Sequence, residues 1–171
     1  MDALSVWFGY LLERLMGVAC LLLLIMTLLI GADVISRNLG LGGIEWSNEA
    51  SEDIIYLLTL LSAPWLLRQG QHIRVDIVLR ALPPRIGWLL EWIGDILGFG
   101  CSVYFVWYGT SVLVASYEAA AISIKTLVIP EWWLLWPLPL AFLLVAIEFL
   151  FRMRRLSLSE RAPRSDAVSA S

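Results

Sequence analysis

Charged side chains inside long apolar stretches are the residues of this sequence whose type and position could do chemistry. Glu91 and Asp95 lie near the start of one such stretch, and Glu148 and Arg152 lie near the end of another. An acid at membrane depth can carry a proton or an ion, or it can pair with a nearby arginine. We expect ion pairs at the inner membrane boundary, and a proton or ion path is the alternative. The candidate partners are Arg14, Arg85 and Arg152.

The residues that usually hold metals, haem or phosphate are not arranged for those tasks. Cys20 and Cys101 lie in apolar stretches without CxxC spacing, where a free cysteine behaves as a small hydrophobe. His72 is the single histidine, whereas a membrane b-type haem commonly takes two. The sequence contains no Gly-rich phosphate loop and no nucleophile elbow. We therefore predict no enzyme activity, no cofactor, and no catalytic or metal-binding residue.

A second acidic group precedes the uncharged stretch 54–67. At about 1.5 Å per residue, that stretch reaches only about 21 Å, which is less than the hydrocarbon thickness of about 30 Å. The helix must therefore begin earlier and carry acids into the outer leaflet. Positions 45, 49 and 52 share one helical face, which we expect to meet water or a partner protein. The acids concerned are Glu45, Glu49, Glu52 and Asp53.

Gly94 and Gly98 form a GxxxG pair in the third apolar stretch. Small residues at this spacing allow two helices to approach closely. The partner helix can belong to the same chain or to another subunit, and the sequence leaves both possibilities open.

Four membrane-spanning helices must position these residues. Of the 171 residues, 60% are hydrophobic and 16% are charged, against about 25% charged in soluble domains. Because a span needs about 20 mostly apolar residues, the apolar blocks predict spans at about 11–35, 47–67, 86–117 and 132–151. The predicted fold class is an all-α membrane protein with one four-helix domain over residues 1–155. The polar remainder, 156–171, is predicted to be a disordered cytoplasmic tail, and residues 118–131 are predicted to be a loop.

A short amphipathic helix is predicted between the second and third spans, lying in the membrane interface. Apolar residues recur there at helical periodicity, with two arginines off the apolar stripe. His72 precedes this helix as a surface loop residue that forms a hydrogen bond. The residues concerned are His72, Arg74, Val75, Asp76, Val78, Leu79, Arg80 and Leu82.

The distribution of basic residues predicts the orientation. If both termini lie inside, every arginine and lysine except Arg37 and Lys125 falls on the inner side. The positive-inside rule therefore places both termini in the cytoplasm. The net charge of −3 gives no reason to expect nucleic acid as a partner.

Several segments resemble the small membrane subunit of tripartite ATP-independent periplasmic (TRAP) transporters, the DctQ-type family. The similarity extends over about residues 10–155. It includes the Pro-Glu-Trp-Trp stretch before the last span, which is similar to the family's entrance to its last helix. The segments that carry it are Trp46–Glu52, Leu66–Asp76, Leu82–Arg85, Ile129–Trp133 and Pro139–Phe142.

The resemblance implies a role in secondary active transport (symport) across the bacterial inner membrane. Such subunits pair with a large membrane subunit that carries the substrate and sodium sites, and a periplasmic solute-binding protein delivers the solute. Ion gradients drive uptake, often of organic acids, without ATP hydrolysis. The expected partners are therefore the large TRAP membrane subunit, the solute-binding protein and membrane lipid. The outer acids of the second helix, with Gly94 and Gly98, are the predicted subunit interface.

Two other function classes stay open on the sequence alone. A self-dimerising four-helix exporter would need an acidic residue deep within a span, whereas the acids here lie near the boundaries. A membrane anchor of a redox enzyme would show a haem absorbance band, and the single histidine argues against it.

Overall fold

In the computed structural model of this chain, residues 3–70, 83–123 and 128–157 are described. Long helices dominate these ranges, and four helical stretches are long and apolar enough to cross a membrane. The predicted all-α, four-span fold class is therefore confirmed. The predicted interfacial helix and most of the predicted tail lie outside the described residues. The helices are α1 (Ala3–Asn38), α2 (Ser47–Arg68), α4 (Pro84–Glu118), α5 (Glu131–Leu135) and α6 (Pro137–Ser157).

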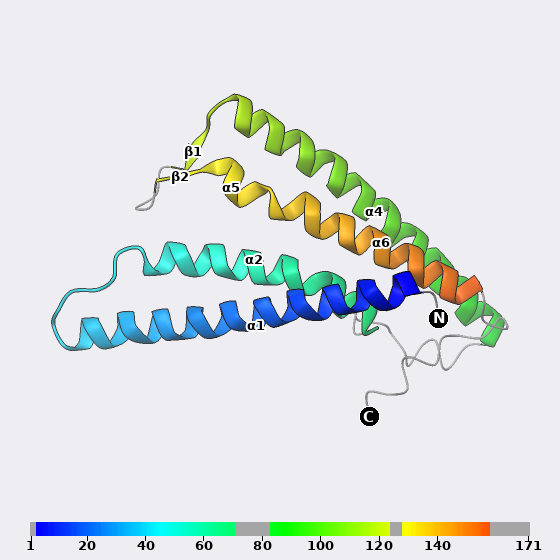
Figure 1. The fold of residues 1–171 in the computed structure, drawn as a ribbon, viewed down its shortest axis with the longest axis horizontal. Helices are drawn as coiled ribbons and strands as arrows, with labels where there is room; N and C mark the ends of the chain where they lie inside the picture. Colours follow the sequence, from blue (N-terminus) through cyan, green and yellow to red (C-terminus); the bar gives the residue numbers. More distant parts are fainter. Residues whose placement is uncertain (1–2, 71–82, 124–127, 158–171) are drawn as a thin grey trace.

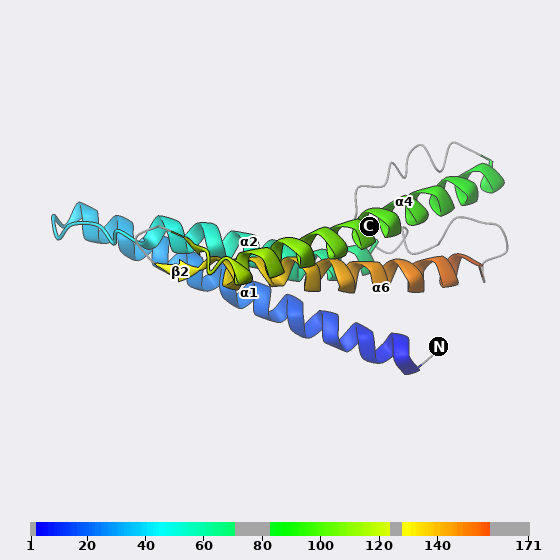
Figure 2. The same cartoon turned by 90° about the horizontal axis from the view of Figure 1, so that it is seen from above.

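The helices form two hairpins, one from α1 and α2 and one from α4 and α6. Contacts between α2 and α6 join the hairpins, so that α1 and α4 are the outer members of the bundle (Figure 1). The hairpins converge near the N-terminus and diverge toward the β1–β2 end. Figure 2 shows that, at the convergent end, α1 and α4 lie on opposite sides of α6. The N-terminal ends of α1 and α4 and the C-terminal ends of α2 and α6 therefore lie at the same end of the molecule.

The buried core is small and lies where the hairpins meet. Leu67 of α2 packs with Val145 and Phe149 of α6, and Ala63 and Phe99 lie against this cluster. Most large apolar side chains instead point outward from the bundle. A helix that is hydrophobic all round suits a lipid environment, where the bilayer replaces the protein core as the apolar medium.

The fourth span is interrupted near its N-terminal end. Helix α5 ends at Leu135 and α6 begins at Pro137, with Trp136 between them. Proline lacks a backbone N–H and its ring clashes with the preceding turn, so it favours a helix start over a helix interior. Pro64 lies inside α2, which nevertheless continues to Arg68.

The loop predicted between the third and fourth spans contains a short β-hairpin. Strand β1 (Ile122–Ser123) pairs antiparallel with β2 (Ile129–Pro130). Glu131 anchors this hairpin, because its backbone N–H donates to the Ala121 carbonyl at 3.1 Å and its Oε2 accepts from the Ser116 hydroxyl at 3.2 Å.

Candidate functional site

Arg68, the last residue of α2, links three helices at the convergent end of the bundle. Its Nη1 donates to Glu148 Oε2 of α6 at 3.4 Å, and its Nη2 donates to the Ser5 carbonyl of α1 at 2.8 Å. A Cβ at Gly9 would lie 2.9 Å from Nη2. A side chain at this position would force the guanidinium to shift, so the glycine leaves room for it beside α1.

Arg152 of α6 makes a second three-helix link beside the first. Its Nε donates to Asp95 Oδ1 of α4 at 3.3 Å, and its Nη1 donates to the Leu67 carbonyl of α2 at 2.8 Å. The side chains of Arg152 and Asp95 are 7% and 5% exposed. The guanidinium carbon also lies 5.9 Å from the centre of the Phe149 ring. This ion pair is thus enclosed by protein on several sides.

Glu148 is the acid at the centre of this arrangement. Its side chain is fully buried, and it accepts from Arg68 of α2 and from Arg155 on its own helix. A buried charge is tolerated when opposite charges and hydrogen bonds compensate it. We call these five residues the arginine clamp: Arg68, Asp95, Glu148, Arg152 and Arg155.

The clamp includes two arginines that sequence reasoning did not assign to an acid. The structure brings Asp95 together with Arg152, whereas Glu148 pairs with Arg68 and Arg155. Arg68 ends one apolar stretch and Glu148 lies near the end of another. Their similar depth was a signal from which this pair could have been predicted. Glu91 is also buried on α4, and Arg14 is exposed on α1.

The outer acids of α2 lie at the divergent end. Glu45 and Glu52 are exposed, while Glu49 and Asp53 are half-buried. Asp53 lines a cavity of about 320 Å³ between α2 and the α5–α6 junction, together with Tyr56 and Trp136. These acids therefore do not form one closed cluster with the arginine clamp.

A buried acid near the C-terminal end of α1 fixes the α1–α2 loop. Asp33 is 6% exposed and accepts from Arg37 Nε at 2.9 Å and from the Ile44 backbone N–H at 2.6 Å. The loop between them contains Gly40 and Gly42 at positive φ, a conformation that favours glycine. The local pairing holds the outer loop in one shape.

The two glycines of the GxxxG pair have different surroundings. A Cβ at Gly98 would collide with the Phe149 ring of α6, whereas a Cβ at Gly94 would meet no atom within 4 Å among the described residues. Gly98 therefore serves packing within this chain, and Gly94 lies on an open face of α4.

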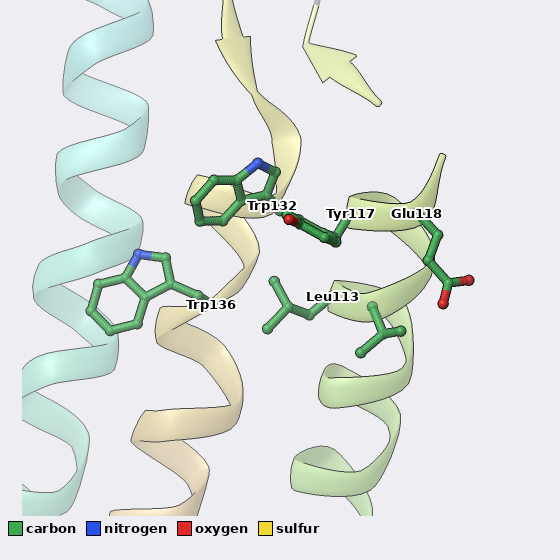
Figure 3. Close-up of a pocket in the computed structure, with 6 residues that line it drawn as sticks. Leu113, Tyr117, Glu118, Trp132 and Trp136 are labelled. Atoms are coloured by element: carbon green, nitrogen blue, oxygen red, sulfur yellow. The ribbon is translucent and has the colours of Figure 1, made fainter. Parts of the chain in front are cut away.

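An aromatic cavity of about 410 Å³ lies at the outer end of α4. Leu113, Tyr117, Trp132 and Trp136 line it, and the rings of Tyr117 and Trp132 meet edge to face at 5.9 Å. Figure 3 shows these two rings close together, with Glu118 directed away from them. The lining is aromatic and aliphatic, which suits an apolar group.

The remaining predicted residues, His72 and positions 74–82 of the interfacial helix, lie outside the described residues. Across 3–70, 83–123 and 128–157, no group of three or more His, Cys, Asp or Glu side chains could hold a metal ion.

Comparison with known families identifies a match over most of the chain. The model described as "Tripartite ATP-independent periplasmic transporters, DctQ component" matches residues 26–158, which is most of the chain and includes the whole arginine clamp. A comparison with curated proteins found no significant match.

Proposed function

Because this chain belongs to the DctQ family of tripartite ATP-independent periplasmic (TRAP) transporter components, we propose that it is the small membrane subunit that supports a large transport subunit. The members of this family are transporter components, and the family is not an enzyme family. The proposed partners are the large TRAP membrane subunit, which moves the solute, and a periplasmic solute-binding protein, which delivers it. Uptake of an organic acid is driven by an ion gradient across the bacterial inner membrane.

The arginine clamp is the observation that carries the scaffold role. Asp95 and Glu148, which an exporter could use to move protons, are each paired with arginines from neighbouring helices. An ionisable group that transports an ion must change partners during each cycle. Charges that instead hold helices together make the bundle rigid. A rigid bundle is what a subunit needs if it stays fixed while its partner moves.

The proposed orientation follows the same charges. Arg68, Arg152 and Arg155 meet at the convergent end, and the positive-inside rule assigns such an end to the cytoplasm. The divergent end, with Glu45, Glu49 and Glu52, then faces the periplasm and the solute-binding protein.

Co-expression with the large subunit tests the proposal. An affinity tag on the large subunit should retain this chain through detergent extraction and size exclusion at a fixed ratio. The matched control is an unrelated four-span membrane protein carried through the same steps. Recovery of this chain as a free species, with none bound to the tagged partner, would refute the scaffold role.

A further inference from the structure

The two outer helices of the bundle present chemically different faces to their surroundings. On α1, the face turned away from α2 carries Leu21, Leu24, Ile25 and Leu28, which are 46–65% exposed. Lipid tails are as apolar as leucine, so this face gains little from leaving the lipid. Over residues 21–28, the exposed side chains named here are all aliphatic and need no hydrogen-bond partner.

The face of α4 turned away from α6 is aromatic and polar. Tyr104, Trp107 and Tyr108 are 62%, 78% and 57% exposed, and Ser111 is exposed beside them. Their i, i+3, i+4, i+7 spacing places them on one helical stripe. The rings of Tyr104 and Tyr108 stack with 6.0 Å between their centres. We call these four residues the α4 stripe.

The α4 stripe lies at membrane depth. The Asp95–Arg152 pair lies eleven residues into α4, and the proposed orientation places it at the inner membrane boundary. At 1.5 Å per residue, Trp107 lies about 18 Å and Ser111 about 24 Å further along the helix. The hydrocarbon core is about 30 Å thick. The stripe is therefore inside it, although Tyr and Trp prefer the two interfaces.

The hydrogen-bonding groups of the stripe need acceptors at that depth. Within the described part of the chain, no hydrogen bond joins the hydroxyls of Tyr104 and Tyr108 or the indole N–H of Trp107 to another residue. Tyr104 makes ring contacts with Phe105 and Tyr108. Lipid tails offer no acceptor, and an unsatisfied polar group in hydrocarbon is costly. A protein helix can supply acceptors there, from side chains or from backbone carbonyls beside small residues.

A groove accompanies the stripe and gives a partner side chain somewhere to sit. A cavity of about 380 Å³ is lined by Val106, Trp107, Thr110, Ser111 and Val114. Val114 also lines the 410 Å³ aromatic cavity (Figure 3), so the hollow surface continues to the outer end of α4.

We propose that the α4 stripe is the docking surface for a transmembrane helix of the large subunit, and that the outward face of α1 stays in lipid. The inference rests on the proposed function and identifies the face of this chain that would contact the large subunit. The partner helix presents hydrogen-bond acceptors opposite Tyr104, Trp107 and Tyr108, complementing the donors of the stripe.

The two native cysteines provide a direct test. Cys101 is exposed on α4 one turn before Tyr104, and Cys20 is exposed on α1. In detergent at mildly alkaline pH, where exposed thiols can ionise, N-ethylmaleimide should label both in the chain alone. In the purified complex with the large subunit, Cys101 labelling should fall about tenfold while Cys20 labelling is unchanged, because helix contact buries one edge of the bundle.

The outcomes separate the two proposals. A stable complex in which Cys101 remains reactive, or in which Cys20 is protected instead, would overturn the docking face and leave the scaffold role standing. Absence of any complex would overturn both. Disulfide-linked Cys101 dimers of this chain that persist when the large subunit is present would show that a second copy occupies the stripe, which also overturns the inference.

A conservative variant supplies the second readout. Tyr104→Phe with Tyr108→Phe keeps the rings and removes two hydroxyls, so recovery of the large subunit should fall about tenfold. Leu24→Ala with Leu28→Ala on α1 is the matched control and should leave recovery unchanged. Equal recovery in both variants would contradict the docking face. Thermal unfolding of the isolated Tyr variant should match the native chain, since these hydroxyls bond no other described residue.

Discussion

Glu148 is the residue whose charge depends most on its neighbours. It is fully buried and forms ion pairs with two arginines. Arg68 reaches it from α2, and Arg155 lies two helical turns further along α6. Removing one partner from a buried ion pair leaves an uncompensated charge, which costs more than the pair itself contributes. The clamp residues are therefore interdependent, and single substitutions should be more harmful than paired ones.

Replacement of Arg68 tests this dependence. Arg68→Met removes the hydrogen bonds to Glu148 and to the Ser5 carbonyl. The free energy of unfolding should fall by about 3 kcal/mol, which for a chain of this size lowers the thermal midpoint by about 5–10 °C. Circular dichroism in detergent measures this midpoint.

Two comparison variants sharpen the result. Arg14→Met changes an exposed arginine of α1 and should leave the midpoint within about 1 °C, since isolated exposed charges contribute little. Arg68→Met with Glu148→Met should recover part of the loss, because an apolar pair needs no compensation. An Arg68→Met midpoint equal to that of Arg14→Met would contradict the clamp.

At the scale of the helices, α4 and α6 approach closely through glycines on α4. A Cβ at Gly98 would collide with Phe149, and a Cβ at Gly109 would lie 2.5 Å from Leu138 Cδ2. The two positions lie on the buried side of α4, away from the α4 stripe. One side of α4 therefore packs against α6, and another side is exposed.

Alanine substitution at the two GxxxG positions separates these sides. Gly98→Ala should lower the free energy of unfolding by about 1–3 kcal/mol through overpacking against Phe149. Gly94→Ala should be neutral or slightly stabilising, because alanine is the better helix former and the site is open. Thermal unfolding of both variants measures the difference, and equal midpoints would refute the packing described for Gly98.

The sequence predicted four membrane-spanning helices, which the structure confirms, but it did not predict which of them are neighbours. Hydropathy identifies spans because the bilayer requires about 20 apolar residues in a helix. It does not say which helices are neighbours. Arg68 and Glu148 are 80 residues apart in sequence, and their pairing depends on α2 lying beside α6. The β1–β2 hairpin was missed because strands of two residues carry no periodicity. Arg152, the partner of Asp95, was among the arginines named from the sequence, whereas Arg68 and Arg155, the partners of Glu148, were not.

At the scale of the whole molecule, two hairpins are joined at one end and diverge at the other. The clamp and the Leu67 core hold the convergent end, while cavities lie between the aromatic residues of the divergent end. This asymmetry fits the proposed scaffold, whose convergent end would be the fixed base in the proposed orientation.

The orientation is open to direct measurement. Single cysteines replace Leu41 in the outer loop or Ser157 at the end of α6, in a background with Cys20→Ser and Cys101→Ser. A membrane-impermeant maleimide should label Leu41→Cys in spheroplasts and Ser157→Cys only after lysis, because the arginine-rich end stays in the cytoplasm. The reverse pattern would place both termini outside.

Solute uptake in proteoliposomes tests the central claim most directly. Vesicles containing this chain together with the large subunit, supplied with the solute-binding protein and an ion gradient, should accumulate solute, while vesicles with this chain alone should accumulate none. Accumulation by this chain alone, or equal uptake by the large subunit without it, would contradict the scaffold account.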